Sequence, residues 1–169
     1  MPFATRADLL ARVNARRLAQ LAVPADHAMP VEETALRAVI AGAAIDSFPA
    51  DEQPALVLAL DAIDRALADA DALILSYGVP PQIQTTLLAR LASTVVLYYL
   101  QGAERMTEDV EKAYKAVIDL LKAFAKGEVD FAPPGPDAPA PGGLASIESA
   151  PPRYAPRGGK AAWPLENWP

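Results

Sequence analysis

The sequence contains no cysteine and a single histidine, and both shortages exclude classes of site. Without cysteine the chain has no thiol nucleophile, no disulfide and few routes to a structural zinc site. His27 lies between two prolines in the stretch 23–30, with Asp26 as its close acidic neighbour. A metal site or a catalytic triad cannot be assembled from that pair alone, so we interpret His27 as a surface-loop residue.

Motifs that position nucleophiles, phosphates or dinucleotides are missing as well. The sequence has no G-x-S-x-G, no G-x-G-x-x-G and no P-loop. It also has no Glu-x-x-His motif, two of which would suggest a di-iron site in a helical bundle. We therefore expect a protein that is not an enzyme and that holds no cofactor and no metal.

Long hydrophobic runs are absent. The longest uncharged stretches are residues 72–89, which Gly78, Pro80 and Pro81 interrupt, and residues 91–103. Neither fits a bilayer span of about 20 apolar residues. The first residues show no basic stretch followed by an apolar one, so we expect no secretory signal. These features predict a soluble intracellular protein without a membrane partner.

Positive charge is scarce, with 15 basic against 21 acidic residues and a net charge of −6. Non-specific binding to DNA draws most of its affinity from lysine and arginine that neutralise phosphates. An acidic chain is therefore not expected to hold DNA, although DNA can still pass along it without specific binding.

Proline divides the chain into two parts. Seven of the 17 prolines lie in residues 1–131, whereas ten lie in residues 132–169. The second part has no helical period and cannot bury enough surface to order itself alone. We predict a folded body, residues 1–131, and an extended Pro/Gly-rich C-terminal arm, residues 132–169.

The arm nevertheless contains both tryptophans of the chain. Large aromatic side chains on a segment that cannot fold alone imply a groove elsewhere that receives them. We predict that residues 132–150 form a spacer and that the partner-binding residues of the arm are Arg153, Tyr154, Arg157, Trp163 and Trp168.

Two long helices, folded back on each other, are predicted between Pro81 and Gly127. In the first, apolar residues recur at spacings of three and four: Leu87, Leu88, Leu91, Val95, Tyr98 and Tyr99. A helix apolar on nearly every side must be buried. The second begins at the N-cap Thr107, ends at Gly127 and has an apolar stripe from Val110 to Phe124. Glu108–Lys112 and Glu111–Lys115 are spaced for ion pairs on its opposite face.

Four more amphipathic patterns precede this pair, and the last of them is long. They predict helices near residues 5–13, 15–22, 31–45 and 54–77, with Thr5 and Asp8 as a capping box and Asn14 as a left-handed stop between the first two. Residues 128–131 are compatible with a short edge strand. The body is expected to be all-α, a small helical bundle with two long antiparallel helices and, at its C-terminal end, this short strand.

The helix predicted at 54–77 is rich in aspartate. A paired-carboxylate or divalent-cation site is one interpretation of Asp61, Asp64, Asp69 and Asp71. The other is a solvated outer face, which is far more common for aspartate alternating with alanine on an amphipathic helix. Tyr98 and Tyr99 pose a similar choice between stacking on a ligand and packing in a core or subunit interface, and we favour packing.

Several short segments resemble the Mu-type phage neck, or head-tail joining, protein family. They are Met1–Thr5 with Asp8-Leu9, then Tyr99-Leu100, Arg105–Glu108, Tyr114, Ala116, Leu120-Leu121 and Ala125–Gly127. The resemblance covers residues 1–22 and about 56–131. Residues 23–55 are longer and richer in proline than the usual family connection, and the arm lies outside the resemblance.

This resemblance implies a head-to-tail connector, or adaptor. Such a protein forms a homo-oligomeric, twelve-subunit ring beneath the portal protein, receives the next neck or tail component and lets DNA pass. Its place would be the neck of the virion, after assembly in the host cytoplasm. Two alternatives remain: a helical binding module, chaperone-like or antitoxin-like, that captures one partner with its arm, and an enzyme that uses the Asp-rich helix with a metal.

Overall fold

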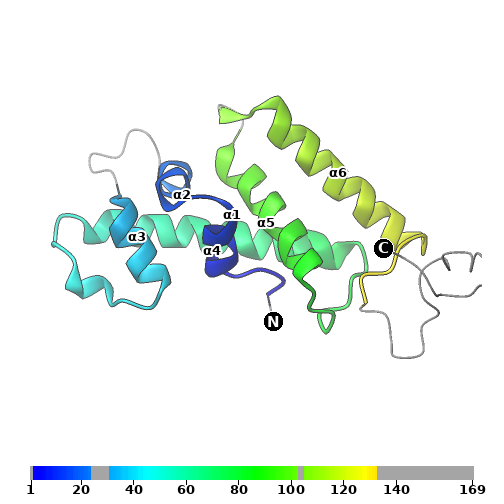
Figure 1. Cartoon of the computed structure of the whole chain (residues 1–169), viewed down its shortest axis with the longest axis horizontal. Helices are drawn as coiled ribbons and strands as arrows, with labels where there is room; N and C mark the ends of the chain where they lie inside the picture. Colours follow the sequence, from blue (N-terminus) through cyan, green and yellow to red (C-terminus); the bar gives the residue numbers. More distant parts are fainter. Residues whose placement is uncertain (1, 24–30, 103–104, 133–169) are drawn as a thin grey trace, which may run out of the picture. The chain divides into compact units, whose positions relative to one another are not determined.

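A computed structural model describes residues 2–23, 31–102 and 105–132 (Figure 1). They lie in the first of two units of the chain, Met1–Pro133, while the second unit, Pro134–Pro169, lies outside the description. In these described ranges the secondary structure is six α-helices and one short 3-10 helix, so the all-α prediction is confirmed. The elements are α1 (Arg6–Arg12), α2 (Ala15–Ala22), α3 (Glu33–Ile40), η1 (Ile45–Ser47), α4 (Gln53–Ser76), α5 (Thr86–Gln101) and α6 (Glu108–Ala125).

The longest helix, α4, is the axis of the body. It starts next to Pro54, whose missing N–H costs no hydrogen bond in the first turn. Gly78, at φ 84°, ends it in a left-handed conformation that glycine adopts without strain. Its inner face alternates alanine with large aliphatic residues, so neighbouring helices approach closely. The buried residues are Ala55, Leu56, Ala59, Leu60, Ile63, Ala66, Leu67, Ala70 and Ile74.

Helix α5 crosses α4 and is covered from several sides, since it also packs against α1, α2 and α6 (Figure 1). The Thr85 side chain accepts a hydrogen bond of 3.2 Å from the Leu88 backbone N–H and caps its first turn. Ser93, fully buried, donates its hydroxyl proton to the Ala89 carbonyl at 2.7 Å, so its polar group is satisfied within the helix. This helix is buried on most sides, as its sequence predicted.

Helix α6 turns back along α5, which confirms the predicted antiparallel pair (Figure 1). Thr107 occupies the N-cap position, but its side chain makes no capping hydrogen bond. Helix α6 ends in a Schellman motif around Gly127. The Gly127 N–H donates to the Phe124 carbonyl at 2.8 Å, and the Glu128 N–H donates to the Ala123 carbonyl at 2.9 Å. Of its apolar stripe, Val117 and Leu121 are the residues that become buried.

The N-terminal helices follow their predicted order with two corrections. The capping box of Thr5 and Asp8 is present at the start of α1. Asn14 is not a left-handed stop: its φ is −63°, and its side chain caps α2 by accepting from the Arg17 N–H at 2.7 Å. Helix α3 is shorter than the predicted 31–45, because Gly42 at φ 106° ends it and residues 45–47 form the separate η1.

Residues 128–131 do not form the short strand that the sequence allowed. Within the described part of the chain the backbone here is irregular. Phe131 is buried instead, and its ring stacks on Phe124 with centroids 4.9 Å apart. The apolar residues of this segment are therefore explained by burial of the Phe131 ring against the end of α6, and not by strand pairing.

Candidate interaction surfaces

Two of the four aspartates of α4 bind the N-terminal segment. Asp64 forms a two-pronged ion pair with Arg6, whose Nε donates to Oδ1 at 2.7 Å and whose Nη2 contacts Oδ2. The hydrogen bond to Asp64 raises the pKa of Arg6. Asp61 and Asp69 are exposed, as a solvated face predicts. Asp64 therefore has a structural role that the helical period did not indicate.

Asp71 binds the backbone of the N-terminal segment. Its Oδ1 accepts a hydrogen bond of 2.9 Å from the Phe3 N–H, and the Phe3 side chain is buried beside it. Burial raises the pKa of Asp71, and the Phe3 N–H partly opposes that shift. Together Asp64 and Asp71 pin residues 3–6 across α4. The predicted solvated face holds for Asp64, which is exposed, whereas Asp71 is half-buried. The contacts that these two aspartates make with the N-terminal segment were not predicted.

The described residues contain no group of three or more histidine or carboxylate side chains placed to hold a metal ion. His27 lies outside the described residues. In the ranges 2–23, 31–102 and 105–132 no helix is long and apolar enough to cross a membrane.

Three tyrosines form a stack between α5 and α6. Tyr98 and Tyr114 lie face to face with ring centroids 3.8 Å apart and an interplanar angle of 10°. Tyr99 meets the rings of Tyr98 and Tyr114 at 6.0 and 6.3 Å. Burial, with Tyr114 and Asp69 adding to the effect, raises the pKa of Tyr99 to about 12. The rings pack on one another, so the packing interpretation of Tyr98 and Tyr99 is confirmed.

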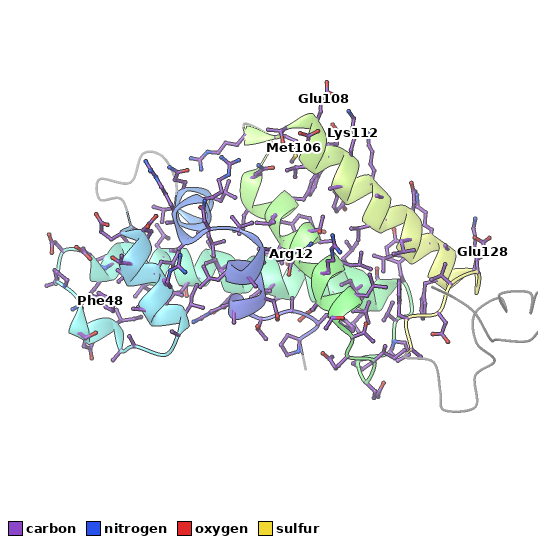
Figure 2. The ribbon with its side chains drawn as sticks, viewed as in Figure 1. Arg12, Phe48, Met106, Glu108, Lys112 and Glu128 are labelled. Carbon is purple, nitrogen blue, oxygen red and sulfur yellow. The ribbon has the colours of Figure 1, made fainter. Side chains whose placement is uncertain are left out.

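The outer face of α6 is a row of ion pairs. Lys112 meets Glu108 at 3.1 Å and Lys115 meets Glu111 at 2.7 Å, as their spacing predicted, and Lys122 adds Asp119 at 3.6 Å. Figure 2 shows Glu108 and Lys112 pointing away from the body. Four lysines balance four carboxylates in residues 108–126, so this face has no net charge.

Two arginines join separate segments of the body by donating to backbone carbonyls. Arg12 reaches from α1 to donate to the Arg90 carbonyl on α5 at 2.5 Å (Figure 2). Arg105 donates to the carbonyl of Gln20 on α2, also at 2.5 Å. Burial and the charge of Arg90 lower the pKa of Arg12. These contacts were not predictable from the sequence because each joins residues from separate segments.

The five residues predicted to bind a partner through the arm all lie outside the described residues: Arg153, Tyr154, Arg157, Trp163 and Trp168. Their role stays a prediction. The boundary between body and arm at residues 131–132 likewise stays a prediction.

A comparison with protein families decides where the chain belongs. The model of the family "Bacteriophage Mu, Gp36" matches residues 3–148. The chain is a member of the Mu Gp36 family. The match is continuous through residues 23–55 and runs to residue 148, so the sequence resemblance, which omitted both regions, was too narrow. No curated protein matches the chain.

Membership of the Mu Gp36 family makes this a phage protein and points to a structural or assembly role.

Proposed function

We propose that this protein is a head-to-tail connector that forms a ring beneath the portal and joins the DNA-filled head to the neck and tail. The observation that carries the proposal is the family match over residues 3–148. In this account the protein is not an enzyme and uses no cofactor. Its partners are further copies of itself, the portal protein and the next neck or tail component.

The charge of the body supports passage of DNA through such a ring. The described residues contain sixteen acidic and twelve basic side chains. An acidic wall repels phosphates, so DNA would slide past it without the counterion release that drives binding. Salt-sensitive binding of duplex DNA by the whole protein would contradict this part of the proposal.

The arm is proposed to attach each subunit to the portal or to a neighbouring subunit. Residues 132–150 would act as the spacer, and Arg153, Tyr154, Arg157, Trp163 and Trp168 as anchors. Linking the body contact to an arm contact makes the second binding event intramolecular, which strengthens attachment without enlarging either contact. Aromatic anchors suit this role because truncating a buried one often costs about 2 kcal/mol or more.

Deletion of the gene from the phage tests the connector role. We expect DNA-filled heads and free tails that fail to join, and electron microscopy of the lysate would show both. Supplying the wild-type gene in trans should restore tailed virions. Normal tailed virions without the protein, or heads that never fill, would contradict the proposal.

The arm is tested in the same phage by supplying a chain that lacks residues 151–169. The body should stay helical by circular dichroism, while the heads should lack tails or lose their DNA. The double variant Trp163→Ala, Trp168→Ala should reproduce most of that defect, and a Pro139→Ala, Pro141→Ala variant of the spacer serves as its control. Infectious virions at normal yield from the truncated chain would show that the arm is dispensable.

A further inference from the structure

Charge is segregated within the described body. Residues 5–23, which form α1 and α2, contain four arginines and one aspartate. Residues 31–53, from α3 to the start of α4, contain one arginine and five carboxylates. A protein whose overall charge is negative therefore presents one positive surface and one strongly negative end. Such a distribution favours contacts between unlike surfaces.

The positive surface, called here the basic surface, consists of Arg12, Arg16, Arg17, Arg90 and Arg105. Arg12 is tied to α5 through Arg90, and Arg105 is tied to α2 through Gln20. Arg16 and Arg17 are exposed on the same helix α2. The ion pairs among the described residues involve other side chains, so these five arginines retain charge to offer to a partner.

The negative region, called here the acidic end, consists of Glu32, Glu33, Asp46, Asp51 and Glu52. Figure 1 shows α3, η1 and the start of α4 gathered at one end of the body. Two apolar side chains lie one turn into α4 next to these carboxylates: Val57 is 44% exposed and Leu58 is 36% exposed. Apolar residues beside a charged rim have the composition of a contact surface.

A second copy of this chain fits both surfaces. If two copies met through the same surface, arginine would face arginine or carboxylate would face carboxylate, which is unfavourable. A head-to-tail contact instead sets the acidic end of one copy against the basic surface of the next. Each copy then has one contact of each kind, which is what a closed ring requires.

We propose that the acidic end of one subunit docks on the basic surface of its neighbour and that this contact builds the ring. The inference rests on the proposed connector function and names the surfaces that the ring would use. Burial of Val57 and Leu58 would supply apolar area, and the charges would set the orientation and the order of assembly. Exposed ion pairs are individually weak and are screened by salt, so assembly should weaken as salt rises.

Charge reversal on the full chain tests the contact. The variant Arg16→Glu, Arg17→Glu has two acidic surfaces, and the variant Asp51→Lys, Glu52→Lys has two basic ones. Each alone should lose the wild-type oligomer in light scattering after gel filtration, whereas an equimolar mixture should recover it. The control Lys112→Glu, Lys115→Glu makes the same change of charge on α6 and should still assemble. Melting curves followed by circular dichroism establish that all variants are folded.

Disulfide trapping detects the contact even when assembly is weak, because the natural chain has no cysteine. Gln20 and Ala50 are exposed, uncharged positions in the basic surface and at the acidic end. A mixture of Gln20→Cys and Ala50→Cys chains should form mixed dimers well in excess of either homodimer at about 50 mM salt, and far fewer at about 500 mM. A mixture of Gln20→Cys with Ala116→Cys, placed on α6, should not.

Two results would overturn the inference. The first is an oligomer, or a set of trapped dimers, that neither charge reversal changes. That result would leave the connector function intact and move its interface elsewhere. The second is salt-sensitive binding of duplex DNA that Arg16→Glu, Arg17→Glu abolishes while no mixed dimers form. That outcome would assign the basic surface to nucleic acid instead.

Discussion

Helices α5 and α6 have similar sequence patterns and different surroundings. Both show apolar residues at spacings of three and four, yet α5 buries seven of its 16 residues and α6 buries two of its 18. The difference arises because α5 packs against α1, α2, α4 and α6, whereas α6 packs chiefly against α5. Periodicity determines that a segment is a helix with an apolar stripe, but the number of neighbours determines how much of the stripe is buried.

This comparison identifies α6 as the helix of the body most easily opened. Local opening is cheapest where few apolar contacts must be broken. Helix α6 is held by the tyrosine stack near its start, by Val117 and Leu121, and by the Phe124–Phe131 stack near its end. Its lysine–carboxylate pairs stabilise the helix itself and add little to its attachment.

The largest expected contrast is between two leucine truncations. Leu88 on α5 is fully buried, and Leu88→Ala should lower the free energy of unfolding by about 2–5 kcal/mol. Leu120 on α6 is half-buried, so Leu120→Ala should cost less than about 2 kcal/mol. Urea denaturation followed by circular dichroism measures both. Equal losses would mean that α6 is as deeply packed as α5.

A second contrast concerns the tyrosine stack. Tyr114→Ala removes a stacked pair worth about 0.5–1.5 kcal/mol beyond its buried area, so α6 should open more often. Hydrogen exchange should accelerate along residues 108–125 and stay unchanged along α4. Tyr114→Phe keeps the ring and is the control. If both helices lose protection together, α6 is not an independent unit.

The sequence predicted the existence and order of the helices well. The positions of the capping residues are local properties, so Thr5 and Gly127 could be interpreted directly. Asn14 was misjudged because asparagine suits both a left-handed stop and an N-cap, and the choice depends on whether the chain continues into another helix. The strand predicted at 128–131 does not form because a short segment with an apolar residue such as Phe131 can bury its ring as readily as it can pair.

The interaction surfaces were harder to predict than the fold. Contacts such as Arg6–Asp64, Phe3–Asp71 and Arg12–Arg90 join residues 58 to 78 positions apart, and no spacing rule connects them. The i,i+4 pairs on α6 were predictable because helical geometry alone places them together. The family match over residues 3–148 shows that the short segments quoted for the resemblance were part of a longer similarity.

A smaller effect separates the N-caps of the two helices. Thr85 caps α5 through a hydrogen bond, so Thr85→Ala should cost about 1 kcal/mol. Thr107 occupies the same position in α6 without that bond, so Thr107→Ala should cost only a few tenths of the loss expected for Thr85→Ala. The N-cap position of Thr107 in the sequence, taken alone, would predict a larger loss. Thermal melts of the two variants side by side provide the measurement. A larger loss for Thr107→Ala would mean that its hydroxyl caps the helix in solution.

The smallest expected effect is a dependence of the free energy of unfolding on pH, which arises from Asp71 on α4. Burial raises the pKa of Asp71 above its ordinary 3.8, so the folded state holds this proton more tightly than the unfolded state. The resulting contribution to the free energy of unfolding is present when the pH is below the ordinary pKa of Asp71. It is lost as the pH rises through the pKa that Asp71 has in the folded state. Asp71→Asn keeps an acceptor for the Phe3 N–H without titrating, so its stability should fall less than that of the wild type as pH rises above the ordinary pKa of Asp71. Asp69→Asn, at an exposed position, is the control, and identical profiles for wild type and Asp71→Asn would contradict the assignment.

The composition of purified virions tests the central claim most directly. Quantitative mass spectrometry would measure the number of copies of this protein relative to the portal protein in tailed, infectious particles. A connector ring predicts a small, fixed number similar to that of the portal subunits, retained through density-gradient purification. A protein made in infected cells but absent from the purified virions would contradict the claim and identify an assembly factor instead.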